Sequence, residues 1–364
     1  MTIRGVYVGD LGSRGSTSVQ RLQTLRSLGC ELAAVPIYRS PIAWEQRSVS
    51  GALSFLGWKR DHTEANRNLR KLAARPLDLV WIDKGLTIRP DTLLWIRRHQ
   101  PNAKLVWYSP DDPILRSNRS IQHRLSIRLY DLHVTTKSYN VPELLEMGAR
   151  DAVFVGNAYD PSIHRPIALS DGDMARWGCD VGFVGAFEQP RADSMLTMAR
   201  AGLSVRVAPS SVWSRMRGQH ANLHVPETSD NLIGDEYARA ICAAKINLGF
   251  LRKLVRDQQT TRTVEVPACG AFMLAERTDE HRELFEEGKE AEFFSSTSEL
   301  IEKARYYLEH EDERLRIAAA GRERCLRDGY SNQRRLGSVL ARLGFRFPTD
   351  SAASITPAAA SEGR

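Results

Sequence analysis

Continuous apolar runs recur along the whole chain, and they restrict its fold more than any other feature of the sequence. In the first half the runs are GVYVG (5–9), ELAAVPI (31–37), LDLVWID (77–83), KLVWYS (104–109), DLHVTTK (131–137) and DAVFVGN (151–157). In the second half they are DVGFVGA (180–186), LSVRVAP (203–209), ANLHVP (221–226), AKINLGF (244–250), GAFMLAE (270–276) and AEFFSS (291–296). Most are apolar throughout, as strands buried on both faces of a parallel sheet are. Amphipathic stretches separate many of them, so the pattern predicts an α/β fold with doubly wound sheets.

The pattern begins again halfway along the chain. DVGFVGAFEQPRADSMLTMARAG repeats the order of RGVYVGDLGSRGSTSVQRLQTLRSLG, which is strand, glycine-containing loop, helix and glycine. The segment between them, 157–178, is rich in Pro, Asp and Gly, as linkers often are. We therefore expect two Rossmann-like domains facing a cleft, at 1–165 and 166–347. The small, polar residues of 348–364 predict a disordered tail.

Composition narrows the class of protein. No apolar run reaches the roughly 18 residues of a membrane-spanning helix, and the N-terminus lacks the apolar core of a signal peptide. The five cysteines are isolated, with no C-x-x-C pair. We therefore expect a cytoplasmic protein. The net charge of +7 favours anionic partners such as nucleotides or a membrane surface. Because the basic residues are dispersed, a nucleic-acid partner is not expected.

One stretch, TTRTVEVPACGAFMLAE (260–276), combines a helix start, a glycine stop and an apolar strand. A helix that begins near Thr263 would direct free N–H groups toward the cleft, where they favour an anion. Arg262 suggests a phosphate, and Glu265 suggests a ribose because a carboxylate accepts hydrogen bonds from neighbouring hydroxyls. Together they suggest a nucleotide. The residues alone leave open a glutamate that only complements the helix dipole beside a surface arginine.

The same stretch, followed by ELFEEGKEAEFFSSTSELIEKARYYLEHEDERLRIAAAGRERCLRDGYS, resembles the C-terminal domain of GT-B glycosyltransferases. It is most similar to the bacterial spore-maturation (CgeB-like) group, with the pattern R-x-x-E-x-x-A-C-G and then F-x-x-G-x-E, which is related to retaining glycosyltransferase family four. The resemblance covers about residues 180–340 and extends more loosely over 75–165. It implies a GT-B fold and sugar transfer from a nucleotide-sugar donor with retention of configuration, and neither a metal ion nor another cofactor.

The resemblance also implies roles for individual residues of the second domain. The related retaining enzymes carry E-x7-E, whose second glutamate binds the ribose and whose first contacts the donor sugar. Glu265 matches the second position, and Asp257 occupies the first with a side chain one methylene shorter. The family holds a basic residue near the pyrophosphate after the first strand of this domain, where VGAFEQPR offers Gly185 and Arg191. Asn247, near a strand end, is a further donor-side candidate, with a turn-side amide as its alternative.

The first domain is expected to hold the acceptor. GDLGSRGST places Gly12 in a βα loop that could approach the acceptor or the donor phosphates, although a simple turn is the alternative. LVWYSPDDP places Asp112 after a strand, where a carboxylate could activate an acceptor hydroxyl. A Pro-flanked turn is the alternative there. His220 and His224 have a helical metal-site spacing, but ANLHVP reads as a strand, so no metal site is expected.

These observations predict a glycosyltransferase of the hexosyltransferase type, in a bacterial pathway such as polysaccharide biosynthesis. Its partners would be a nucleotide sugar and a glycan, lipid-linked or small-molecule acceptor. Peripheral association with the inner face of a membrane would suit the basic charge. Two rival interpretations share the fold: a nucleotide-sugar epimerase and a non-catalytic binding or structural protein. Asp257 in place of glutamate keeps the second rival open.

Overall fold

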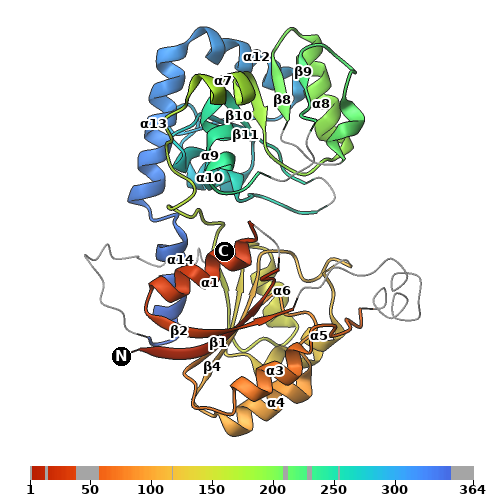
Figure 1. Cartoon of the computed structure of the whole chain (residues 1–364), viewed down its shortest axis with the longest axis vertical. Helices are drawn as coiled ribbons and strands as arrows, with labels where there is room; N and C mark the ends of the chain where they lie inside the picture. Colours follow the sequence, from red (N-terminus) through yellow and green to blue (C-terminus); the bar gives the residue numbers. More distant parts are fainter. Residues whose placement is uncertain are drawn as a thin grey trace, which may run out of the picture.

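The chain forms two parallel sheets of six strands each, stacked end to end along the molecule (Figure 1). Each of the expected apolar runs overlaps one strand, which confirms the α/β class and the doubly wound sheets. The predicted tail at 348–364 lies outside the described residues. The computed structural model describes residues 2–12, 15–37, 57–116, 118–207, 212–227, 232–252 and 255–345.

The first sheet has the order β2-β1-β3-β4-β5-β6 and every neighbouring pair is parallel. Strands β3 and β5 are buried along their whole length, because helices cover both faces of the sheet. The strands are β1 (Ile3–Gly9), β2 (Cys30–Pro36), β3 (Leu79–Asp83), β4 (Lys104–Ser109), β5 (Leu132–Thr135) and β6 (Ala152–Phe154). The helices are α1 (Thr17–Ser27), α3 (Ala65–Leu72), α4 (Pro90–His99), α5 (Ile121–Ser126), the 3-10 turn η2 (Ile127–Leu129) and α6 (Asn140–Glu146).

The second sheet has the order β12-β11-β10-β7-β8-β9, again all parallel. The strand sequence reverses between β7 and β10, which creates a crevice at their carboxyl ends. The strands are β7 (Cys179–Phe183), β8 (Val205–Val207), β9 (Leu223–His224), β10 (Ala244–Gly249), β11 (Met273–Glu276) and β12 (Glu292–Phe294). The helices are α7 (Asp171–Trp177), α8 (Gln189–Arg200), η3 (Trp213–Met216), α9 (Gly234–Ala243), α10 (Arg262–Ala268), α11 (Asp279–Leu284), α12 (Thr297–Glu309) and α13 (Glu311–Arg327). The last helix of the described chain, α14 (Asn332–Arg342), follows them.

The chain passes between the two sheets twice, and the two connecting segments are hydrogen-bonded to each other. In the first connecting segment, the backbone N–H of Tyr159 donates to the carbonyl of Tyr330 at 3.1 Å. The N–H of Asn332, in the second connecting segment, donates to the carbonyl of Tyr159 at 2.8 Å. Helix α14 then packs against α1, and its Leu336 is buried in the core of the first sheet (Figure 1). The sequence analysis placed this helix in the second domain, at 166–347. Its apolar face fits the first sheet instead, which periodicity alone does not reveal.

No helix among the described residues is both long and apolar enough to cross a membrane.

A cluster of buried aromatic and histidine rings lies under α5 in the first domain. His123 stacks on Trp107 with ring centroids 3.9 Å apart, and His133 lies 5.4 Å from both rings. Within the described ranges, neither ring nitrogen of His133 has a hydrogen-bond partner. Burial lowers the pKa of His133 to about 3, and burial together with His133 lowers the pKa of His123 well below its usual value. Both rings are therefore neutral in the folded protein.

We expect acid to destabilise the first domain through these rings. The unfolded chain binds a proton on each histidine below a pKa of about 6.5, whereas the folded chain does not, so stability is complete above that pH and falls below it. His133 alone should cost about 2 kcal/mol between pH values of about 7 and 5. Urea unfolding at the two pH values measures the loss, and His133→Phe should reduce the pH dependence. The same dependence in His133→Phe as in wild type would contradict this explanation; the exposed His99→Gln should keep the wild-type slope.

Candidate functional site

A cleft of about 890 Å³ lies between the two domains, at the carboxyl ends of strands from both sheets. The first domain contributes Thr17, Pro110, Asp111, Lys137 and Asn157. The second domain contributes Phe183, Gly185, Ala186, Arg191, Phe250, Arg252, Asp257, Thr260, Thr261 and Arg262. Residues from β4, β5, β7 and β10 loops thus meet, as expected for two Rossmann-like domains that face each other.

The described residues that line the cleft include four cationic side chains, Lys137, Arg191, Arg252 and Arg262, against two carboxylates. The carboxylates, Asp111 and Asp257, are both engaged in ion pairs with cations of the cleft or its rim. The excess positive charge makes the cleft a site for an anionic ligand.

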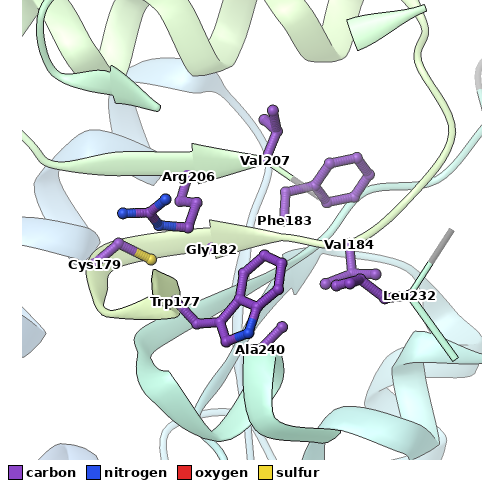
Figure 2. Close-up of a pocket in the computed structure, with 9 residues that line it drawn as sticks. All are labelled: Trp177, Cys179, Gly182, Phe183, Val184, Arg206, Val207, Leu232 and Ala240. Carbon is purple, nitrogen blue, oxygen red and sulfur yellow. The ribbon is translucent and has the colours of Figure 1, made fainter. Parts of the chain in front are cut away.

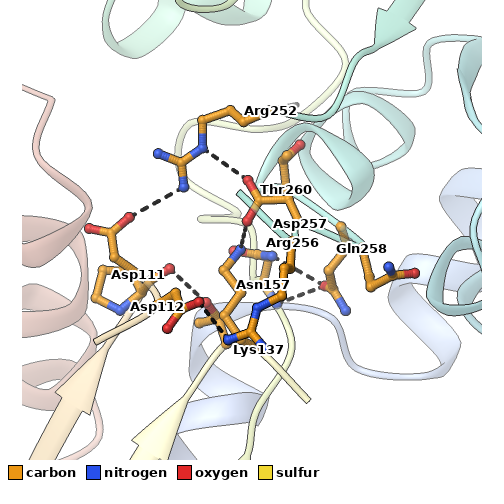
Figure 3. Close-up of polar contacts among 12 residues, drawn as sticks. Asp111, Asp112, Lys137, Asn157, Arg252, Arg256, Asp257, Gln258 and Thr260 are labelled. Carbon is orange, nitrogen blue, oxygen red and sulfur yellow. Dashed lines mark hydrogen bonds and ion pairs between the residues drawn. The ribbon is translucent and has the colours of Figure 1, made fainter. Parts of the chain in front are cut away.

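A chain of alternating charges crosses the cleft from one domain to the other (Figure 3). Lys137 Nζ of the first domain lies 2.5 Å from Asp257 Oδ1 of the second, and the two side chains are only 5% and 3% exposed. Arg252 Nε lies 2.9 Å from the other oxygen of Asp257, and its Nη2 lies 3.5 Å from Asp111. Asp257 therefore has both oxygens paired, and its neighbours fix the position of two cations in the cleft.

Asp111 continues the chain into the first domain, where Lys84 pairs with it. Burial raises the pKa of the Asp111 carboxyl, but Lys84 and Arg252 outweigh burial, so the pKa lies below its usual value. Asp111 is thus ionised at neutral pH.

A second set of contacts joins the domains beside the cleft. Arg256 donates to Asp112 at 2.9 Å and to Glu143 at 2.8 Å, and its guanidinium stacks on Tyr139 at 4.2 Å. The hydrogen bonds to Glu143 and Asp112 raise the pKa of Arg256. Asp112 also accepts from Asn140 at 3.1 Å. The carboxylate expected to act as a base is instead buried in a bridge between domains and does not line the cleft.

Arg191 and Arg262 are held by backbone carbonyls. Arg191 donates to the carbonyl of Ala186 at 2.9 Å, and Arg262 donates to that of Val184 at 3.0 Å. A carbonyl fixes the position of a guanidinium without cancelling its charge. Burial lowers the pKa of Arg191, which lies 3.8 Å from Glu188. These two arginines can therefore offer charge to a ligand more readily than Lys137 can.

The loop after β7 has a shape that needs glycine at position 185. A Cβ atom on Gly185 would lie 2.4 Å from the ring of Phe183, which is too close. The carbonyl of Gly185 accepts a hydrogen bond of 2.9 Å from Trp213. The loop therefore passes close to the cleft wall with a fixed backbone path.

The cleft brings together four of the residues predicted from the sequence: Gly185, Arg191, Asp257 and Arg262. Helix α10 begins at Arg262, as expected, so the arginine and its preceding threonines face the cleft. The roles predicted for these four residues, in binding the phosphates and the donor sugar, remain predictions.

Four other predicted residues lie outside the cleft lining. Glu265 is buried, accepts a hydrogen bond from Tyr237 and lies 3.5 Å from His164 Nε2. Thr263 is bonded to His281 at 2.8 Å.

Asn247 and Gly12 are the other two. Asn247 donates to the carbonyl of Ile241 at 3.0 Å, so it caps α9 from within the sheet. Gly12 lies exposed in the first βα loop, where its N–H is 3.3 Å from Asp10. Thr17, the first residue of the helix that follows this loop, does line the cleft.

The cleft also contains residues that the sequence analysis does not single out. Lys137 and Asn157 end the apolar runs DLHVTTK and DAVFVGN. The rule that carboxyl ends of parallel strands line the crevice would have found both. Arg252 also comes soon after a strand, because β10 ends at Gly249, so the same rule would have drawn attention to it. Within the described ranges, no group of three or more His, Cys, Asp or Glu side chains is placed to hold a metal ion.

Two further cavities lie in the second domain. One, of about 230 Å³, is a small and mostly apolar pocket between Trp177, Phe183 and Val207 (Figure 2). The other, of about 1390 Å³, adjoins the cleft, with which it shares Arg191 and Phe250. It extends past Glu276 to the serine-rich start of α12. The larger cavity gives a ligand in the cleft room to extend over the ends of β10, β11 and β12.

Comparison with protein families identifies one matching segment. Residues 192–341 match a family model described as glycosyl transferase-like. The segment contains Arg252, Asp257 and Arg262 of the cleft. Among curated proteins, none shows significant sequence similarity to the chain.

Solved structures with the same fold extend over nearly the whole chain. HepE from Anabaena, solved with UDP and glucose, has a TM-score of 0.62 at 11% identity, covering 93% of this chain and 100% of its own. Sucrose-phosphate synthase from Thermosynechococcus elongatus has a TM-score of 0.61 at 12% identity, covering 94% and 99%. A protein from Listeria monocytogenes, described as a UDP-N-acetylglucosamine 2-epimerase, has a TM-score of 0.57 at 12% identity, covering 97% and 100%. At these identities the similarity establishes the fold, and the expected GT-B architecture is confirmed.

We expect the Lys137–Asp257 pair to stabilise the junction strongly. Removing one partner of a buried pair leaves an unpaired buried charge and costs about 3–5 kcal/mol. A double-mutant cycle of Lys137→Met and Asp257→Asn, measured by urea unfolding, should show a coupling energy well above about 1 kcal/mol. The matched control is the exposed pair Lys245–Asp180, at 3.1 Å, where the coupling should stay below about 1 kcal/mol. Equal coupling in the two pairs would contradict the assignment of the junction to Lys137 and Asp257.

Proposed function

We propose that the protein is a glycosyltransferase that moves a sugar from a nucleotide sugar to an acceptor hydroxyl. The observation that carries the proposal is the cationic cleft between the two domains of a GT-B fold. The glycosyl transferase-like match over 192–341 supports it from the sequence side. HepE, which shares the fold, was solved with UDP-glucose, so a uridine diphosphate sugar is the first donor to consider.

In this proposal the diphosphate of the donor binds among Arg191, Arg252 and Arg262, with Lys137 reaching it from the first domain. Charge accumulates on the diphosphate as the bond to the sugar breaks, and cations already fixed in place stabilise that charge in the transition state. The positive charge comes from side chains, so we propose that no metal ion is needed. The larger adjoining cavity leaves room for the nucleoside.

The acceptor enters from the first domain. Asp257 is held by Lys137 and Arg252, so it orients these cations and is poorly suited to remove a proton. We therefore propose that the acceptor oxygen bonds to the anomeric carbon while its proton passes to the departing phosphate. Attack from the side of the leaving group retains the anomeric configuration. The acceptor classes are a glycan, a lipid-linked sugar and a small molecule.

A nucleotide-sugar epimerase is the second candidate, because the Listeria protein with the same fold is described as one. An epimerase needs acid and base groups at the sugar, whereas the two carboxylates of the described cleft are both held in ion pairs. We therefore rank it below glycosyl transfer. A binding protein without turnover is the third candidate.

Donor binding can be tested with a panel of UDP-, GDP-, ADP- and dTDP-sugars in thermal unfolding. A donor at about 100 times its dissociation constant should stabilise the protein by about 2.7 kcal/mol. Arg262→Met should weaken binding by about ten- to a hundredfold, because a charge-assisted hydrogen bond contributes about 1.5–3 kcal/mol. Arg217→Met is the control, because its guanidinium also binds backbone carbonyls, those of Pro226 and Glu227, and it does not line the cleft. No stabilisation by any nucleotide sugar would overturn the proposal.

The reaction can be tested with the donor so identified and a set of sugar acceptors. We expect NMR of the product to show the anomeric configuration of the donor, and a chelator to leave the rate unchanged. An inverted product, or a rate that a chelator abolishes and Mg²⁺ restores, would contradict the proposed mechanism. Formation of an epimerised sugar without an acceptor would favour the epimerase, and binding without turnover would favour a non-catalytic protein.

A further inference from the structure

The first domain carries a surface that combines exposed arginines with one exposed leucine and two half-buried apolar side chains. We call it the basic-apolar face, and it consists of Arg119, Ile121, Arg124, Leu125, Arg128 and Met147. Five of these residues line one shallow surface cavity of about 680 Å³. The side chains of Arg119 and Ile121 lie side by side, because both would touch a Cβ atom placed on Gly57, at 3.6 and 3.5 Å.

The fold does not require the apolar side chain of Leu125. Helix α5 already buries Gln122, His123 and Ser126 against the domain. Its opposite side presents Leu125, which at 66% exposure is the most exposed large hydrophobic side chain among the described residues. Leu145, on the neighbouring helix α6, is 45% exposed. Apolar side chains gathered on one exposed surface indicate a binding site rather than a core.

The basic-apolar face carries more positive than negative charge. Arg119, Arg124 and Arg128 are exposed. The nearby carboxylates of Asp131 and Glu143 are engaged elsewhere, at 2.8 Å from Arg97 and 2.8 Å from Arg256. Glu146 is an exposed carboxylate on the adjoining helix. The side chain of Arg128 lies against Gly148, where a Cβ atom would come within 2.9 Å of its Nε.

We propose that the basic-apolar face docks the protein on a bilayer that contains anionic phospholipids. The arginines would bind lipid phosphates, and Leu125 and Ile121 would enter the edge of the hydrocarbon region. Nucleic acid fits less well, because it would need aromatic side chains among the arginines for stacking, and this face has none.

The docking does not depend on the proposed catalysis.

The test is sedimentation of the purified full chain with phosphatidylcholine vesicles, with and without phosphatidylglycerol. Wild type should sediment with the anionic vesicles and not with the neutral ones, and added salt should weaken the binding. The variant Arg124→Glu/Leu125→Ser/Arg128→Glu should bind at least about tenfold more weakly, since each basic residue near an anionic surface contributes to attraction. Its circular dichroism and melting temperature should match wild type, because the three side chains are exposed.

The matched control is Leu315→Ser/Arg316→Glu on α13, where Leu315 is 56% exposed beside an exposed arginine. It should sediment like wild type. Failure of wild type to prefer anionic vesicles would overturn the proposal, as would equal losses in the two variants. Binding to DNA or to an acidic peptide in place of vesicles would also overturn it.

Thermal stabilisation by the nucleotide sugar separates this proposal from the catalytic one. The variant of the basic-apolar face should keep the wild-type shift, whereas Arg262→Met should lose the shift and keep vesicle binding.

Discussion

The buried ion pair between Lys137 and Asp257 is the contact on which the geometry of the cleft depends. Two charges that are 5% and 3% exposed lose most of their hydration, and such a pair is stable only when its remaining hydrogen-bonding groups are satisfied. Arg252 provides this by binding the second oxygen of Asp257. Because Lys137 belongs to one sheet and Asp257 to the other, the pair fixes how the two sets of strand ends face each other.

Other crossings hold the same arrangement. The outgoing and returning segments pair through Tyr159, and Arg256 joins Asp112 and Glu143 across the boundary. Helix α14 anchors the end of the described chain on the first sheet. On the cleft side, Arg262 is held by the carbonyl of Val184 and the hydroxyl of Thr261. Arg191 is held by the carbonyl of Ala186 and lies 3.8 Å from Glu188. The result is a cleft in which the carboxylates are occupied by structural partners while both arginines keep positive charge at its wall.

The position of each residue in the sheet topology, and the partners of its side chain, explain why some of the predicted site residues meet in the cleft and others do not. Arg191 lies in the first turn of α8 and Arg262 begins α10, and the topology of a parallel sheet places the starts of helices that follow strands at the crevice. Glu265 is only three residues from Arg262, yet its carboxylate is taken by Tyr237 and lies beside His164. Those partners come from α9 and from the segment between the domains. The motif alone cannot show which side of the short helix faces them.

The sequence by itself determined the α/β class, the two parallel sheets and the start of the helix at Arg262. These features follow from local periodicity, because the spacing of apolar residues within one segment is enough to predict a buried strand or an amphipathic helix. The tertiary structure decided the rest: that α14 returns to the first sheet, that Asp112 bridges the domains, and that Lys137 meets Asp257 across 120 residues of sequence. These contacts join residues that are far apart in the sequence, and they depend on how the two domains pack together. The pattern of residues within a single segment does not predict that packing.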